Sequence, residues 1–357
     1  MKKRIAIFVL IYLVFLIIPA QSHDVDIITI LAAGDIYLGG SANNYLKQNG
    51  YAYPFEYTKN ILPNADITMA NLEAPLTNRT DAFMEKEFVL KHSPDAVGAI
   101  KNAGFDVLTL ANNHIMDYGP GGLQDTIDIL NKAGIKYTGA GKNSKAARTP
   151  VIVNIKNKKI AFLAYSLVFP EEYYATDDSS GTAQGVFDNI KSDIKNISKH
   201  ADIIIISFHW GEEKMKYPKE YQVQLAHLAI YNGASLVIGH HPHVIQGVEK
   251  YKNGLIFYSL GNFVFGSFGQ AILERPEGMI ALLSFSQNGV ISGEIIPLNV
   301  DNRDVLFQPK PLQSEKFEAA IKNVQEISSR FQVKLDAKAG KGSLRFDDKL
   351  SMAPIQR

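Results

Sequence analysis

Short apolar runs alternate with helix-like segments along the chain, and this alternation most restricts the folds it can adopt. The runs are rich in Val, Ile, Leu and Phe and apolar at consecutive positions, which is typical of strands covered on both faces. Strands are predicted at residues 27–33, 67–70, 107–111, 151–155, 160–166, 203–209, 235–238, 255–260 and 279–285. Helices are predicted at 93–103, 121–133, 189–200 and 217–232, and three of them are followed by Gly. Strands alternating with helices indicate an α/β fold with a substantially parallel core.

The later strands are separated by tight turn signals rather than by helices. These signals are Lys252-Asn253-Gly254 and Gln287-Asn288-Gly289, which favour antiparallel hairpins. We therefore expect two packed mixed β-sheets flanked by helices, contained in one domain at 25–312. Residues 313–357 are expected to form an appendage, with a polar helix at 315–333 and a loose tail that includes 337–342.

The N-terminus has the pattern of a secretory signal. A basic start at residues 1–4 is followed by an unbroken apolar run at 5–20, and small residues occupy Ala20 and Ser22. The run is slightly shorter than the roughly 20 residues that a membrane-spanning helix needs. Residues 1–22 are therefore predicted to be a signal peptide, with an uncleaved membrane anchor as the alternative. In both cases the body of the protein is expected to work outside the cytoplasm, in the periplasm or on the outer face of the membrane.

Composition excludes several classes of function. The chain has no Cys, so thiolate-held metal and disulfides are impossible, and its net charge is only +1. Lys and Arg are scattered rather than gathered with aromatic residues, which argues against nucleic-acid binding. A Gly-x-Ser-x-Gly elbow and a Gly-x-x-x-x-Gly-Lys loop are both missing, so neither a serine hydrolase nor the use of ATP is expected.

Polar side chains occur where the predicted strands end. They are Asp35, Asn71, Glu73, Asn113, His114, Asp117, His209, Trp210, Glu212, His241, His243 and Asn262. In open α/β sheets the ligand site lies beyond the carboxyl ends of the strands, so these residues plausibly form one site. Pro242 favours a defined turn between His241 and His243, and such a turn can make the two imidazoles converge.

Imidazole, carboxylate and amide groups of this kind suit one or two divalent ions, such as manganese, zinc or iron. Two ions would need a shared ligand and would activate one water between them, and Glu73 can act as the bridge. His114 could stabilise or protonate a leaving oxygen, and Asp117 could orient its imidazole. Asn71, Trp210, Glu212 and Asn262 are candidates for contact with a substrate, although each of them could equally shape the surrounding turns.

The ordered motifs GDIYLGG, NLEAPLT, LANNHIMDYG, FHWGEE, GHHPHVIQ and YSLGNFVF resemble the CapA family of poly-γ-glutamate capsule synthesis. The resemblance covers roughly residues 28–298 and implies a metallophosphatase-like fold. It implies metal positions at Asp35, Glu73, Asn113, His209, His241 and His243, and it likens His114 to the leaving-group histidine of phosphatases. The residue at position 240 is usually small in that family, so His240 is not expected to be a ligand.

The chain also departs from the wider calcineurin-like pattern, which begins with Asp-x-His. Here Asp35 is followed by Ile36 and Tyr37, so that the first histidine ligand is missing. The first metal position would then have only Asp35, Glu73 and His243 as ligands. Two functions stay open: a metal-dependent hydrolase acting on a phosphoester or an amide of the polymer, or a non-catalytic scaffold. The resemblance implies membrane-embedded capsule synthase subunits and anionic poly-γ-glutamate as partners in both cases.

Overall fold

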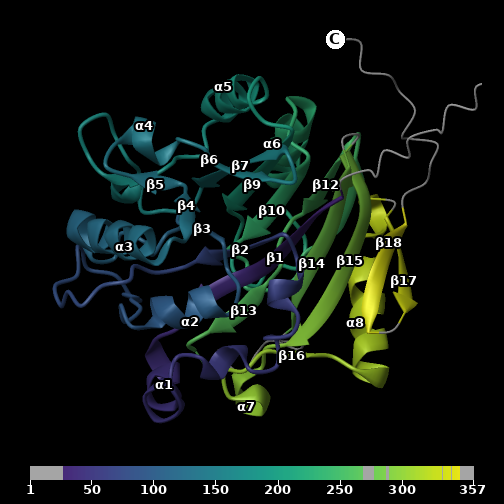
Figure 1. Ribbon diagram of the computed structural model, residues 1–357, viewed down its shortest axis with the longest axis horizontal. Helices are drawn as coiled ribbons and strands as arrows, with labels where there is room; N and C mark the ends of the chain where they lie inside the picture. Colours follow the sequence, from purple (N-terminus) through teal and green to yellow (C-terminus); the bar gives the residue numbers. More distant parts are fainter. Residues whose placement is uncertain (1–26, 268–276, 287–288, 332, 339, 346–357) are drawn as a thin grey trace, which may run out of the picture.

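The computed structural model describes residues 27–267, 277–286, 289–331, 333–338 and 340–345, whose strands build two large sheets (Figure 1). The first sheet has ten strands along the path β17-β18-β15-β14-β1-β2-β3-β4, with β13 beside β1 and β16 beside β15. Its strands are β1 (Ile28–Tyr37), β2 (Ile67–Leu72), β3 (Val107–Thr109), β4 (Lys136–Thr138), β13 (Asn262–Phe265), β14 (Glu277–Ser286), β15 (Gly289–Asn299), β16 (Lys310–Pro311), β17 (Lys334–Lys338) and β18 (Lys341–Arg345).

The second large sheet has six strands in the order β11-β12-β10-β9-β7-β6. They are β6 (Val151–Ile155), β7 (Lys158–Ser166), β9 (Ile203–His209), β10 (Leu236–His240), β11 (Val248–Tyr251) and β12 (Gly254–Phe257). A separate two-stranded ribbon pairs β5 (Ala140–Gly141) with β8 (Gly181–Thr182). Both large sheets mix parallel and antiparallel pairs, which confirms the predicted fold class of two mixed sheets flanked by helices.

Parallel pairing at the centre of each sheet aligns the ends of the strands. In the first sheet, Asp35 of β1 is in register with Asn71 of β2. In the second sheet, His209 of β9 is in register with His240 of β10. The polar residues that follow the apolar runs are therefore brought to one edge of each sheet, as the position of ligand sites in α/β folds requires.

The two sheets pack face to face, and helices cover their outer faces. One apolar cluster joins the inner faces and includes Ile30 and Met69 of the first sheet with Ile205 and Ile238 of the second. The helices are α1 (Asn43–Asn49), α2 (Ala96–Asn102), α3 (Gly119–Ala133), α4 (Ser144–Ala147), α5 (Phe187–Ile197), α6 (Glu220–Tyr231), α7 (Asn302–Val305) and α8 (Ser314–Ile327). Ile100 and Leu123 pack the helices α2 and α3 on the first sheet, whereas Ile194 packs α5 on the second (Figure 1).

The C-terminal region corrects one expectation. The predicted helix is present as α8, but residues 337–338 and 341–342, expected to be loose, belong to the antiparallel strands β17 and β18. The hairpin extends the first sheet beyond β15, and Leu344 is buried in the core that the two sheets share. The hairpin was not predicted because single apolar residues alternate with Lys and Ser in its strands. This alternation arises because only one face of the hairpin is covered.

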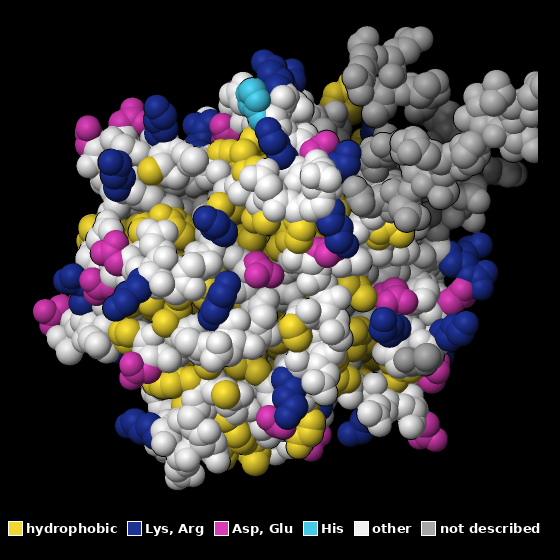
Figure 2. All heavy atoms as spheres, viewed as in Figure 1, with side chains coloured by type: hydrophobic (Ala, Val, Ile, Leu, Met, Phe, Trp, Pro, Cys, Tyr) yellow, Lys and Arg dark blue, Asp and Glu magenta, His cyan; other side chains and the backbone are white. Residues whose placement is uncertain are grey.

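The predicted leader at 1–22 lies outside the described residues. Among the residues that the structure describes, none of the helices has the length and apolar character needed to cross a membrane. Basic and acidic side chains are interspersed over the face of the molecule seen in Figure 2, in keeping with the net charge of +1.

Candidate metal centre

The first sheet contributes a buried pair of carboxylates. Asp35 lies in β1, and Glu73 directly follows β2; both side chains are 0% exposed. The amide of Asn71 holds them together, since Nδ2 donates to Asp35 Oδ1 at 2.9 Å and to Glu73 Oε2 at 3.3 Å. The backbone N–H of Asp35 donates to Gly261 O at 3.1 Å, which also fixes the end of β1 against the chain before β13.

The second sheet contributes imidazoles from two strand ends. His209 is the last residue of β9, and the turn after β10 carries His241 and His243. Both turn histidines have positive φ, 92° and 57°, on either side of Pro242. The ring centroids of His209 and His241 are 4.8 Å apart, and those of His241 and His243 are 5.8 Å apart. The turn therefore makes the imidazoles converge, as the position of the proline predicts.

Side chains from the two sheets meet around Glu73. Its Oε1 lies 3.8 Å from His209 Nε2 and 3.5 Å from His243 Nε2, while His243 Nδ1 lies 3.6 Å from Asp35 Oδ2. Asn113 joins from the loop after β3, with Oδ1 2.9 Å from His209 Nε2. Each pair combines one group from the first sheet with one from the second.

Two sets of possible ligands share Glu73. In each set one nitrogen or carboxylate oxygen per residue lies within 4.8 Å of the others: Glu73 with His209 and His241, and Asp35 with Glu73 and His243. Such an arrangement suits two ions bridged by one carboxylate. A third set joins Glu213 to His241 and His243.

Electrostatics and missing hydrogen bonds indicate what these residues lack. Burial, and then the neighbouring Asp35 carboxylate, raises the pKa of Glu73 well above its usual value. Burial, and then the His241 imidazole, lowers the pKa of His209 well below 6.5, and burial lowers that of His241 to about 3.

Glu73 Oε1 and His241 Nδ1 are buried and have no hydrogen-bond partner among the described residues. Buried polar atoms are normally paired, and a divalent cation would accept their lone pairs and offset the carboxylate charge. The residues present therefore fit a metal ion.

A second group of side chains adjoins the candidate ligands. His114 Nδ1 lies 2.7 Å from Asp117 Oδ2, the orientation expected from the sequence. Asp117 also accepts from Lys86 Nζ at 2.7 Å and from Tyr173 OH at 2.9 Å through Oδ1. Burial opposes ionisation of Asp117, but the hydrogen bond from His114 and the charge of Lys86 hold its pKa below the usual value. Burial lowers the pKa of His114, so this imidazole is neutral at pH 7.

Two of the predicted substrate residues lie away from the cluster, which corrects the prediction for them. Trp210 is 0% exposed, stacks on Phe208 and donates from Nε1 to Tyr258 O, so it packs on the side of β9 opposite His209. Glu212 points outward and pairs with Lys219 at 2.6 Å. Asn262 does lie at the cluster, where its Oδ1 is 2.9 Å from His243 Nδ1.

Three residues that were not predicted as part of the site adjoin the candidate ligands. Lys86 comes from a segment without regular structure, and nothing in its pattern marks it. His240 was not expected to be a ligand, and its Nδ1 lies 2.8 Å from Asp35 Oδ1. Glu213, rather than its neighbour Glu212, lies near the turn histidines after Gly211, whose φ is 88°.

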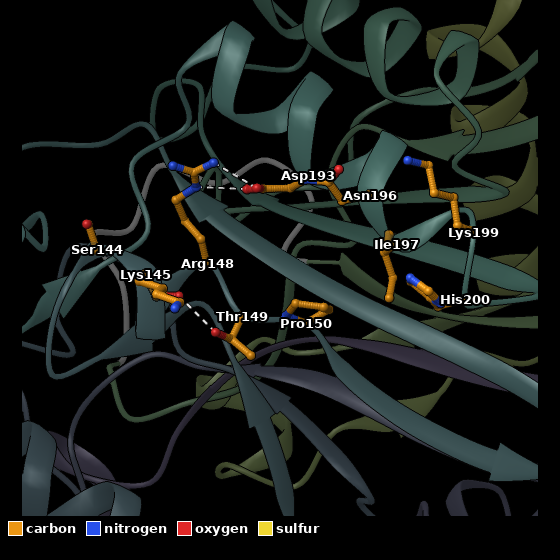
Figure 3. A pocket seen from close by; sticks show the side chains of 10 residues that line it. All are labelled: Ser144, Lys145, Arg148, Thr149, Pro150, Asp193, Asn196, Ile197, Lys199 and His200. Atoms are coloured by element: carbon orange, nitrogen blue, oxygen red, sulfur yellow. Dashed lines mark hydrogen bonds and ion pairs between the residues drawn. The ribbon is translucent and has the colours of Figure 1, made fainter.

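A hollow of about 640 Å³ lies elsewhere, between α4 and the C-terminal end of α5 (Figure 3). Its wall includes Arg148 and Asp193, which form a two-point ion pair, and Tyr165 OH donates to the same carboxylate. The hollow contains none of the predicted site residues. Because its central charges already satisfy one another, the cluster around Glu73 is the stronger candidate for a functional site.

Comparisons with known proteins agree with the motifs. A family model described as "Bacterial capsule synthesis protein PGA_cap" matches residues 29–267. The chain is 32% identical to "Capsule biosynthesis protein CapA" of Bacillus anthracis, with 94% of this chain and 79% of the relative covered. It is 30% identical to "PGA biosynthesis protein CapA" of Bacillus subtilis (strain 168), with 78% and 73% covered. Among solved structures, the calcineurin-like phosphoesterase YfkN from Bacillus subtilis matches with a TM-score of 0.42 and 14% identity, covering 85% of this chain and 97% of that one.

Proposed function

Because the chain belongs to the family of bacterial capsule synthesis proteins, we propose that it acts in the synthesis or export of a poly-γ-glutamate capsule. We propose further that the residues around Glu73 hold one or two divalent ions and that the site hydrolyses a phosphoester or an amide bond. The observation that carries the proposal is the convergence of buried carboxylates and imidazoles, with Glu73 Oε1 and His241 Nδ1 left without hydrogen-bond partners.

In this proposal Asp35, Glu73 and His243 hold one ion, and Glu73, Asn113, His209 and His241 hold the other. When bound, such ions supply Lewis-acid polarisation of a phosphoryl or carbonyl oxygen. The chain itself positions the donors: Asn71 orients both carboxylates, and Asn262 orients the His243 ring. These contacts fix the geometry before any ligand arrives, as efficient sites require.

His114 is the candidate for proton transfer. Its Nδ1 faces the Asp117 carboxylate, so Nδ1 carries the proton of the neutral ring and Nε2 is left to exchange a proton with a ligand. Asp117 stabilises the imidazolium that forms when Nε2 takes up that proton, and Lys86 and Tyr173 keep Asp117 in place. A leaving oxygen could then receive the proton from His114.

A non-catalytic polymer-binding subunit is the second candidate. It is favoured by the Ile36-Tyr37 sequence after Asp35, which leaves one metal position short of a histidine. Tyr37 is 5% exposed and packs on His92 and Phe265, so it offers no replacement ligand. In both roles we place the protein outside the cytoplasm beside membrane synthase subunits. The basic and apolar pattern of residues 1–22 supports this location, and the names of the relatives support only the role in capsule biosynthesis.

The test is capsule formation in the producing bacterium, with its own copy of the gene replaced by variants. His241→Ala and Asn113→Ala are expected to abolish the capsule, whereas His200→Ala, which alters an exposed histidine of the distant hollow, should leave it intact. Full capsule from both site variants would overturn a role for the centre. Hydrolysis of a chromogenic phosphodiester by the wild type, lost in Asn113→Ala, would favour the enzyme over the scaffold.

A further inference from the structure

Glu213 faces the two turn histidines from the loop that follows β9. Its carboxylate belongs to a set of possible ligand atoms, all within 4.8 Å of one another, with His241 and His243. The two histidines belong to different halves of the proposed centre, since His243 lies against Asp35 and His241 against His209. Glu213 therefore lies on the solvent side of the two proposed metal positions.

The loop that carries Glu213 is attached to the histidine turn. The backbone N–H of Lys214 donates to Pro242 O at 2.8 Å, and the side chain of Gln246 donates to Met215 O at 2.8 Å. Gln246 is itself buried and accepts a hydrogen bond from the buried amide of Gln222. The carboxylate is thus placed beside the turn by bonds on its C-terminal side, although its own side chain is exposed.

A further observation connects Glu213 with the buried cluster. His241 belongs both to the set that contains Glu213 and to the set that contains Glu73. It is 5% exposed and keeps Nδ1 without a hydrogen-bond partner among the residues described. A divalent cation would accept that lone pair and offset the charge of the adjoining Glu213 carboxylate.

We infer that Glu213 is a metal ligand, supplied by the loop after β9. The inference rests on the proposed metal centre and adds one oxygen donor to it. The Glu213 carboxylate lies within 4.8 Å of ligand atoms of both His241 and His243, so it can complete the coordination of an ion held by either histidine. An added carboxylate favours manganese over zinc.

The experiment is calorimetric titration of the full chain, freed of metal by a chelator, with Mn²⁺ alone. Glu213→Gln is compared with Glu212→Gln, which removes the same charge one residue away from a side chain that pairs with Lys219. The wild type and Glu212→Gln should bind with equal affinity and stoichiometry. Glu213→Gln should lose one ion, or bind it at least about tenfold more weakly, and the electron paramagnetic resonance signal of bound Mn²⁺ should change accordingly.

The outcomes separate this inference from the proposed function. If the wild type binds Mn²⁺ and Glu213→Gln binds it identically, Glu213 is not a ligand and the inference fails alone. If both variants weaken binding equally, the effect is one of charge and the inference also fails. If the wild type takes up no Mn²⁺, the site is not a manganese centre, and the inference and this form of the proposed function fail together. Circular dichroism and thermal unfolding of the metal-free variants should match the wild type, because Glu213 is exposed.

Discussion

Nε2 of His209 lies 2.9 Å from Oδ1 of Asn113, and this contact joins the ends of strands from two different sheets. His209 ends β9 of the six-stranded sheet, whereas Asn113 follows β3 of the ten-stranded sheet. Both groups can donate a lone pair to one ion, and the apolar contacts between the sheets hold them at this separation. The candidate centre therefore depends on the packing of the whole molecule.

Asn113→Ala is expected to weaken metal binding with little effect on folding. The side chain is partly exposed, and its amide oxygen has the His209 ring as its partner. We expect the affinity for Mn²⁺ to fall about tenfold or more, as for loss of other groups that support a metal site. The free energy of unfolding, measured in urea with a chelator present, should change by less than about 1 kcal/mol. Unchanged affinity would remove Asn113 from the set of ligands.

Asn112→Ala, unlike Asn113→Ala, should lower the stability of the fold strongly. The Asn112 amide donates to Asn71 Oδ1 and Leu72 O, and its oxygen accepts from the backbone N–H groups of His114 and Ile115. Removing it leaves several buried groups unpaired, at an expected cost of about 2–4 kcal/mol. Urea unfolding of the metal-free protein measures this loss, and a cost below about 1 kcal/mol would contradict the account.

The positions of the site residues were largely predictable because they follow buried strands. Polar groups after the runs at 27–33 and 67–70 had to lie at one edge of the first sheet, and the register of Asp35 with Asn71 places them there. The assignments of Trp210 and Glu212 as substrate contacts were wrong for a local reason. Trp210 is one residue beyond His209 and so points to the opposite face, and after Gly211 it is Glu213 rather than Glu212 that lies beside the turn histidines.

Other features depend on contacts that no local pattern reveals. Lys86 acquires its importance only where it meets Asp117, 31 residues away. The strand β13 comes from a stretch for which no strand was predicted, and it is held by parallel pairing with the end of β1. The hairpin of β17 and β18 is likewise set by pairing with β15 rather than by its own composition.

Stability should decrease in mild acid because of His92. This imidazole is fully buried, and burial lowers its pKa from 6.5 to about 3, while its Nδ1 accepts from Leu38 N–H at 3.1 Å. Between pH 6.5 and about 3 the unfolded chain binds a proton at this position that the folded chain does not bind. The free energy of unfolding therefore falls as the pH falls through this window, by up to about 1.4 kcal/mol per pH unit.

His92→Gln isolates that contribution. Glutamine can still accept from Leu38 N–H but does not titrate, so the variant should show a smaller loss of stability between pH 7 and pH 4. Urea unfolding at a series of pH values, with chelator present, gives both slopes. Equal slopes for the variant and the wild type would show that His92 is not the group responsible.

Gly34→Ala is expected to disturb the end of β1 beside Asp35. A Cβ atom at this position would lie 2.0 Å from Gly261 O, the carbonyl that accepts from Asp35 N–H. The backbone would have to move, at a cost of about 3 kcal/mol or more. Gly98→Ala is the matched control, because a Cβ there meets nothing within 4 Å and Ala is the better helix former. Equal midpoints of thermal unfolding for the two variants would contradict this reading of the contact.

Anomalous X-ray scattering from crystals soaked in Mn²⁺ tests the central claim most directly. We expect one or two strong peaks enclosed by Asp35, Glu73, His209, His241 and His243, with at least one peak about 2.0–2.3 Å from a carboxylate oxygen of Glu73. Peaks only at surface carboxylates, or no peak near Glu73 after a soak at saturating Mn²⁺, would show that these side chains do not form a metal centre.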